Sequence, residues 1–188
     1  MKTTIEQLMN EYNNCFWLNG SDSVFFEKLT NDELQFLQEH SDSCDAKFLY
    51  ALASFHGHKT LSDAENILRE LAGDGYTPTK YQIGDLIFKA DKKKVNRYID
   101  EAADAGYAPA LFRIGLLMLL DGDQNSAEKY FSKAAESEYV PALINLGTLY
   151  QQTGEFKDAF KVYHKAAEKG SPEAMLIIGE MYENGIGV

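Results

Sequence analysis

A short string recurs along the chain at nearly constant intervals, and this repetition constrains the fold more than any other feature. PALINLGTLY begins at Pro141, and near-copies begin at Pro78, Pro109 and Pro172. The glycine of each copy lies 31 or 32 residues after the glycine of the copy before it. A period of this length is typical of proteins built from stacked helix pairs. The sequence therefore predicts an all-α fold.

The recurring string has the composition of a helix that packs closely on a neighbour. Alanine, glycine and an apolar residue recur in phase, as Ala110, Gly115 and Met118; Ala142, Gly147 and Tyr150; and Ala174, Gly179 and Tyr182. A glycine inside a helix costs about 0.5–1 kcal/mol relative to alanine, so its repeated use needs a compensating reason. We expect each glycine to let a partner helix approach the backbone. Gly147→Leu is then expected to be strongly destabilising through overpacking.

Each string is followed by a second segment that carries an apolar stripe. Ala127, Tyr130, Phe131 and Ala134 recur 32 residues later as Ala159, Val162, Tyr163 and Ala166. Residues at i, i+3, i+4 and i+7 share one helix face. The pattern predicts a right-handed α-solenoid of antiparallel helix pairs with about four and a half repeats. The repeats are expected at 46–78, 79–109, 110–141 and 142–173, with a partial one at 174–188.

Residues 1–45 do not follow the repeat and are predicted to form an N-terminal helical cap. Ile5, Leu8 and Tyr12 have the spacing of an amphipathic helix. Thr30 begins T-N-D-E, which predicts a capping box with Glu33 at the start of another helix. We interpret the aromatic residues of this segment as packing of the cap, with a contribution to a partner site as the alternative. These residues are Phe16, Trp17, Phe25 and Phe26.

The repeated segments resemble the Sel-one-like repeat, a relative of the tetratricopeptide repeat. The matching stretches are ALINLGTLY, VYHKAAEKG, YFSKAAESE and EAMLIIGEMYENGIGV, and the resemblance covers residues 46–188. It implies an α-solenoid whose first helices line a concave face, and a scaffold or adaptor that binds other proteins or peptides. Two departures from the family pattern stand out. The internal units are shorter than usual, and the G-x-G-V signature occurs only as Gly185 to Val188.

The resemblance also indicates which residues would face the concave side. In tetratricopeptide-type units these lie three residues before the helix glycine, one after it and four after it. The apolar and aromatic members gather in the first three units, where they suit the anchoring of a partner. The candidate partner-binding residues are Phe48, Leu52, Phe55, Tyr81, Asp85, Phe88, Phe112, Leu116 and Leu119. The alternative is that neighbouring units bury them, or that the N-terminal segment fills the groove.

The same three positions turn polar toward the C-terminus, where they are occupied by Thr148, Gln151, Glu180 and Glu183. In PALINLGTLY only Ile144 and Thr148 are expected to be free to touch a partner.

Charge and composition narrow the classes of partner. The net charge is −11, which argues against nucleic acid and against an anionic membrane surface. No stretch approaches the roughly 20 apolar residues that span a membrane. We find no catalytic set of residues, and His56 and His58 lack the further ligands that a metal site needs. The sequence therefore predicts a protein that is not an enzyme and has no cofactor, no metal and no catalytic residues.

The leading functional hypothesis is a non-enzymatic scaffold or adaptor that binds a protein or peptide on its concave face. The alternative is an immunity or antitoxin-like protein that neutralises a basic toxin through its acidic surface. The first residues lack the apolar run of a signal peptide, so we expect a cytoplasmic protein. The chain stops where the family pattern would continue into a second helix. We therefore expect an incompletely covered last helix, with self-association through that end as a further expectation.

Overall fold

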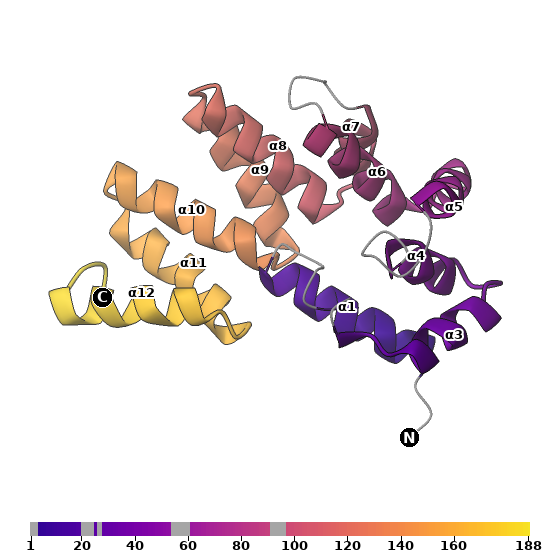
Figure 1. Cartoon of the computed structure of the whole chain (residues 1–188). Helices are drawn as coiled ribbons and strands as arrows, with labels where there is room; N and C mark the ends of the chain where they lie inside the picture. Colours follow the sequence, from indigo (N-terminus) through magenta and orange to yellow (C-terminus); the bar gives the residue numbers. More distant parts are fainter. Residues whose placement is uncertain (1–3, 20–24, 26–27, 54–60, 91–96) are drawn as a thin grey trace. The chain divides into compact units, whose positions relative to one another are not determined.

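Eleven α-helices make up the computed structural model within the part of the chain that it describes (Figure 1). That part comprises residues 4–19, 25, 28–53, 61–90 and 97–188. It contains no strand, so the all-α prediction is confirmed. The helices are α1 (Ile5–Asn19), α3 (Asn31–Glu39), α4 (Cys44–Ala53), α5 (Leu61–Gly73), α6 (Thr77–Ala90), α7 (Arg97–Asp104), α8 (Ala108–Leu120), α9 (Gln124–Glu136), α10 (Val140–Thr153), α11 (Phe156–Glu168) and α12 (Pro172–Asn184).

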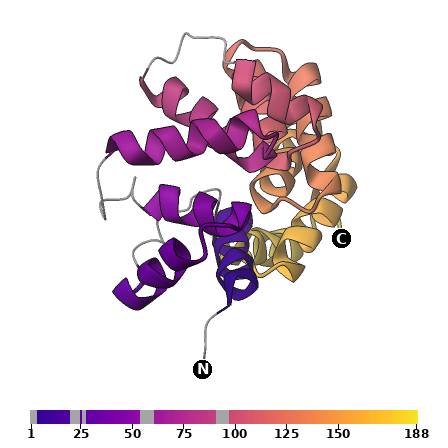
Figure 2. The ribbon, with the colours of Figure 1, turned by 90° about the vertical axis from the view of Figure 1, so that its right-hand side faces the viewer.

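The helices belong to two compact units. The N-terminal unit comprises Met1–Phe16 and Ser21–Ala105, and the C-terminal unit comprises Trp17–Gly20 and Gly106–Val188. Within each unit, every helix from α3 to α7 and from α8 to α12 packs on the next one in chain order. Figure 2 shows the helices of the C-terminal unit, coloured orange to yellow, following one another in this way. Contact between successive elements is the packing of a helical repeat protein.

Prolines and turn glycines recur at the boundaries of the repeats. Prolines occupy the first turn of α8, α10 and α12, where a missing N–H is tolerated. The turns before α8 and α12 contain Gly106 and Gly170, whose φ angles of 79° and 89° lie in the left-handed region. The turn before α10 has Glu138 at the same place, with φ of 57°. A side chain rarely adopts this conformation, so this turn departs from the glycine rule.

The N-terminal region forms the predicted helix and the predicted capping box. Leu8 and Tyr12 of α1 are buried, and so is Phe25. At the start of α3 the Thr30 hydroxyl accepts a hydrogen bond from the Glu33 N–H at 3.3 Å, and the Glu33 carboxylate accepts from the Thr30 N–H at 2.9 Å. The side chains of Phe16 and Trp17, and the whole of Phe26, lie outside the described residues.

Two of the helix glycines admit an aromatic ring from the second helix of their repeat. A Cβ atom on Gly147 would lie 2.7 Å from ring carbons of Tyr163, and one on Gly115 would lie 2.6 Å from a ring carbon of Phe131. Both rings are buried. The predicted close approach is therefore confirmed at these two positions. It is wrong at Gly179, where a Cβ atom would have no neighbour within 4 Å, because no described helix covers that side of α12.

The final glycine signature packs against the start of α11. Gly187 has a φ of 71°, and a Cβ atom there would collide with the backbone of Phe156. The Ile186 N–H donates to the Met181 carbonyl oxygen at 2.9 Å, which closes the C-terminal end of α12. The G-x-G-V motif thus folds the tail back onto the preceding helix.

Thr79 stands where later repeats have alanine, and it carries a stability cost. Its side chain is fully buried, and its hydroxyl oxygen has no hydrogen-bond partner within the described part of the chain. We expect Thr79→Val, which keeps the shape and removes the hydroxyl, to raise the free energy of unfolding by about 1 kcal/mol. Urea denaturation followed by circular dichroism measures the change. Thr153→Val is the control, because the Thr153 hydroxyl already donates to the Leu149 carbonyl oxygen at 3.2 Å. A lower stability of Thr79→Val would contradict the prediction.

Candidate functional site

In the N-terminal unit, the predicted partner-binding residue Phe48 of α4 packs against α1. Phe48 and Leu52 are buried. The Tyr12 ring of α1 packs edge-on against Phe48 with 5.6 Å between ring centroids, and Tyr76 contacts Phe48 from another side at 5.5 Å. The Tyr12 hydroxyl also accepts a hydrogen bond from the Gln82 amide of α6 at 3.1 Å. In this unit Tyr12 of the N-terminal helix therefore covers Phe48, and whether Phe48 and Leu52 contact a partner stays a prediction.

The other candidates of this unit lie in or near α6. Tyr81 and Asp85 are both buried, and both have interaction partners. Phe88 lies in α6, but its side chain is outside the described part, and Phe55 lies outside the described residues altogether. Whether these residues contact a partner stays a prediction.

In the C-terminal unit, the three candidates on α8 are half-buried. Phe112, Leu116 and Leu119 pack against a core cluster that contains Phe131 of α9. The ring of Phe112 lies 5.5 Å from the ring of Phe131, centroid to centroid. These side chains therefore contribute to the core and keep part of their surface exposed.

The equivalent positions of α10 form a hydrogen-bonded group that the sequence analysis missed. The Tyr163 hydroxyl donates to the Gln151 side-chain oxygen at 2.9 Å and lies 3.2 Å from the Thr148 hydroxyl. Burial raises the pKa of Tyr163, so its hydroxyl keeps its proton and remains a donor. Thr148 is thus engaged by the second helix of its own repeat. Ile144 is half-buried and packs against a core cluster, while Thr148 stays exposed. Whether these two residues contact a partner stays a prediction.

In the two helix pairs α8–α9 and α10–α11, the residues beside the helix glycine match the ring that covers it. In α8 the residues one and four places after the glycine are the leucines Leu116 and Leu119. The ring that covers this glycine is that of Phe131 in α9. In α10 the two equivalent residues are Thr148 and Gln151. The ring that covers the glycine of α10 is that of Tyr163, which carries a hydroxyl. An apolar pair on the first helix therefore accompanies phenylalanine on the second helix, and a polar pair accompanies tyrosine. The signal was present in the sequence, because each ring lies 16 residues after its glycine.

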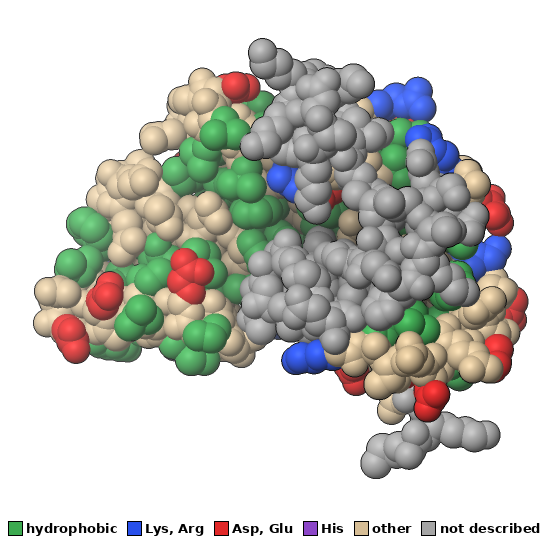
Figure 3. Space-filling model, viewed as in Figure 1, with side chains coloured by type: hydrophobic (Ala, Val, Ile, Leu, Met, Phe, Trp, Pro, Cys, Tyr) green, Lys and Arg blue, Asp and Glu red, His purple; other side chains and the backbone are tan. Residues whose placement is uncertain are grey.

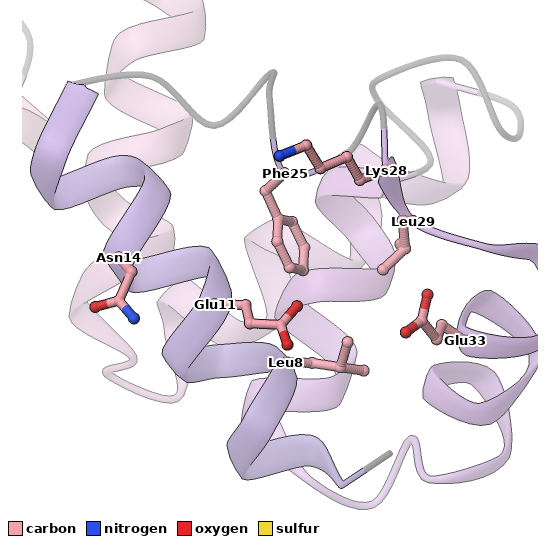
Figure 4. Close-up of a pocket in the computed structure, with 7 residues that line it drawn as sticks. All are labelled: Leu8, Glu11, Asn14, Phe25, Lys28, Leu29 and Glu33. Carbon is pink, nitrogen blue, oxygen red and sulfur yellow. The ribbon is translucent and has the colours of Figure 1, made fainter. Parts of the chain in front are cut away.

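The N-terminal unit also contains a pocket of about 280 Å³ between α1 and α3 (Figure 4). Figure 4 shows Leu8 and Glu11 of α1 pointing into the space below Phe25, with Glu33 on the opposite side. Glu33 is held by the capping box with Thr30. The polar rim that a ligand could meet is therefore formed by Glu11 together with Asn14 and Lys28.

Two further properties concern the described residues as a whole. None of their helices is both long and apolar enough to cross a bilayer. No three or more of their histidine, cysteine, aspartate and glutamate side chains are grouped so that they could hold a metal ion.

Comparisons with known proteins agree with this repeat geometry. The profile of the tetratricopeptide repeat family matches residues 140–168, which span α10 and α11 completely. A protective antigen of uropathogenic Escherichia coli strains that displays an SLR (Sel-one-like repeat) fold is similar, with 26% identity and a TM-score of 0.67. The match covers 82% of this chain and 37% of the antigen. This chain therefore spans little more than a third of that protein.

Two other solved structures show the fold. A Sel1 repeat protein from Oxalobacter formigenes is 20% identical, with a TM-score of 0.66 over 97% of this chain and 80% of its own. An immunity protein from Pseudomonas aeruginosa is 22% identical, with a TM-score of 0.67 over 93% of this chain and 69% of its own. No curated protein sequence gives a match. The helix pairs, the contacts between helix glycines and aromatic rings, and these likenesses together show a helical repeat fold that is similar to the folds of Sel-one-like and tetratricopeptide repeat proteins.

Proposed function

We propose that the chain is a non-enzymatic scaffold that binds a protein or peptide through the first helices of its repeats. The observation that carries the proposal is an apolar row at the end of α8. Leu120 is 80% exposed there, one turn after the half-buried Leu116 and beside Leu119. Exposed apolar side chains that adjoin a core cluster offer the contact area that interfaces use. Helical repeat folds present such surfaces for binding other proteins.

The partner-binding residues predicted from the sequence have different roles in this proposal, according to how buried they are. Phe112, Leu116 and Leu119 are assigned direct contact with the partner, because part of each remains exposed. The buried candidates of the N-terminal unit hold α4 and α6 in place beneath α1. Phe55 and Phe88 keep the direct role that the repeat pattern gives them.

Affinity capture from cells that contain the protein tests this function. We expect wild-type chain to retain a specific protein, and Leu120→Asn to retain about tenfold less of it. The variant should fold normally, because the Leu120 side chain that it replaces is 80% exposed in the wild type. Phe156→Asn is the control, since Phe156 is an exposed apolar residue at the start of α11. Equal capture by Leu120→Asn would refute binding at α8.

The salt dependence of the captured complex separates the two sequence-derived hypotheses. An apolar contact at α8 should hold its affinity between about 50 and about 500 mM NaCl, because screening acts on charges. A steep loss over that range would instead indicate neutralisation of a basic partner by the acidic surface.

A further inference from the structure

The lysines of the C-terminal unit are confined to the second helices of its repeats, α9 and α11. The first helix α10 has no charged residue, and α12 has glutamates but no lysine, arginine or histidine. Figure 3 shows hydrophobic and acidic side chains over α12 and no basic ones on the face in view. The lysines lie on α9, on α11 or at the C-cap of α11, and they are Lys129, Lys133, Lys157, Lys161, Lys165 and Lys169. In a chain of net charge −11, this unit thus gathers its lysines on one kind of helix.

These six residues, which we call the lysine row, follow the repeat of the fold. Lys129 and Lys133 recur 32 residues later as Lys161 and Lys165. All four side chains are exposed, and each lies two residues from the buried aromatic ring of its helix, so it points to the opposite side. The repeat that follows α9 is fully described as α10 and α11, and it leaves both lysines of α9 uncovered. The exposure of the row is therefore a property of the repeat itself.

The spacing of the row works against the stability of its helices. Residues four apart are neighbours on a helix surface, and like charges at this spacing destabilise the helix. Four lysines follow one another in this way on α11 and its C-cap, at positions 157, 161, 165 and 169. Lys157 also lies in the first turn of α11, where the helix dipole disfavours a positive charge. A partner of opposite charge would offset these costs.

Ion pairs within the chain leave most of the row without a counter-ion. The Lys161 ammonium lies 2.7 Å from the Asp158 carboxylate, and Lys169 pairs with Glu138. Among the described residues, the other four lysines have no carboxylate within ion-pair distance. Their charges are thus available to a partner.

A hollow of about 470 Å³ borders the row and adds an apolar surface to it. Its lining includes Lys161 and Lys165 together with Tyr150 and Val162. The half-buried Tyr150 of α10 packs against the core clusters of both α9 and α11. Its hydroxyl also forms a hydrogen bond with the Ser132 side chain of α9. The hollow therefore has a fixed floor and room for an apolar side chain of a partner.

The carboxylates around the row limit the kind of anion that fits. Glu128 and Glu136 on α9 and Asp158 and Glu168 on α11 flank the lysines. A nucleic acid duplex carries one negative charge per about 1.7 Å of its axis, so it would meet these carboxylates as well as the lysines. A helix advances about 6 Å in four residues, so a partner helix with a carboxylate at every fourth residue has the same charge spacing as the row. Such a helix fits better than a continuous polyanion.

A second copy of this chain does not supply that partner. No described helix has carboxylates at three positions that are each four residues apart. Two copies would also approach each other with a net charge of −11 each, and like charges repel. The charge pattern therefore favours a different protein.

We propose that the outer face of α11 binds an acidic, amphipathic helix of another protein. Its carboxylates, one on each turn, pair with Lys157, Lys161 and Lys165, and an apolar side chain enters the hollow beside Tyr150. The lysines of α9 extend the positive surface along the neighbouring repeat. These residues differ from the apolar row of α8, so the inference does not depend on the proposed function.

The test uses the full chain and a designed peptide as the probe. The fluorescein-labelled peptide forms about four helical turns. It has glutamate at every fourth residue, leucine just before each glutamate and alanine elsewhere. Binding is followed by fluorescence anisotropy at about 50 mM NaCl, where screening is weak. We expect the double variant Lys161→Gln with Lys165→Gln to weaken binding about tenfold, because two ion pairs are lost.

The matched control removes the same charge elsewhere. Lys28→Gln with Arg97→Gln changes two exposed residues of the N-terminal unit and should leave the affinity unchanged. Leu120→Asn should also bind the peptide as wild type does, so a failure of the α8 site and a failure of this one are distinguishable. No binding to wild type, or equal weakening by the two double variants, would overturn the proposal.

An isomeric peptide tests the spacing of the carboxylates. Its glutamates form one consecutive block, which keeps the composition and spreads the charges around the helix. We expect it to bind about fivefold more weakly than the first peptide, because fewer carboxylates reach the lysines at once. Equal affinity of the two isomers would show that the row responds only to net charge, and the match to a helix would be wrong.

Two further measurements test the competing occupants. A labelled DNA duplex of about 15 base pairs should bind more weakly than the first peptide, because the flanking carboxylates repel it. Tighter binding of the duplex would overturn the assignment to a protein helix. In sedimentation velocity, the lysine double variant should behave as the wild type does. A wild-type dimer that the double variant abolishes would show that a second copy fills the surface.

Discussion

Gly147→Leu should lower the free energy of unfolding by about 3 kcal/mol, among the largest effects of any single substitution in the C-terminal unit. Even a Cβ atom at this position would lie 2.7 Å from the Tyr163 ring. The ring cannot move aside easily, because it is buried and its hydroxyl is held by Gln151 at 2.9 Å. Urea denaturation monitored by circular dichroism measures the loss.

The same substitution one repeat later is the matched control. Gly179 occupies the equivalent place in α12, where a Cβ atom meets nothing within 4 Å. Gly179→Leu should therefore raise the stability by about 0.5–1 kcal/mol, because leucine favours a helix more than glycine does. If the two variants lost stability equally, the loss could not be attributed to the contact between the added side chain and the Tyr163 ring, and this explanation would be wrong.

Tyr12→Ala should lower the free energy of unfolding by about 4 kcal/mol, the typical cost of removing a large buried aromatic side chain. The ring is buried and packs edge-on against Phe25 at 5.7 Å and Phe48 at 5.6 Å between centroids. Its hydroxyl accepts from the buried Gln82 amide. The variant removes the ring contacts and the hydrogen bond together, and thermal or urea unfolding reports the sum.

Tyr12→Phe separates the two contributions. It keeps the ring and leaves the Gln82 amide without this acceptor, so the expected loss is about 1 kcal/mol. A loss with Tyr12→Phe as large as that with Tyr12→Ala would mean that the hydroxyl, and not the ring, attaches α1 to the unit. Wild-type stability in both variants would show that α1 does not hold the repeats.

The fold could be predicted from the sequence because its determinants are local and repeated. Pro141 and Pro172 mark helix starts, and Gly115 and Gly147 mark where rings approach. Each repeat supplies the same signal again, so a chance match at one place is corrected by the others. This is the reason why the helix pairs and their order were predictable. The capping box at Thr30 lies outside the repeats and was predictable from the local T-N-D-E pattern alone.

The candidate site was less predictable, because burial depends on contacts between distant parts of the chain. Phe48 has the spacing of a groove residue, but Tyr12, 36 residues earlier, covers it. The periodicity shows which face a side chain occupies and gives no information on what lies opposite. Unlike the burial of Phe48, the hydrogen bond between Thr148 and Tyr163 could have been predicted, because Tyr163 carries a hydroxyl at the position paired with Thr148. A comparison of paired positions along the repeats would have found it.

The position of α1 changes how the N-terminal unit responds to stress. In a simple array each repeat touches only its neighbours, so the ends can fray while the middle stays folded. Here one tyrosine joins α4 and α6, two first helices that belong to successive repeats. The two helices are then expected to unfold together. The contact with the N-terminal helix makes the first two repeats one cooperative unit.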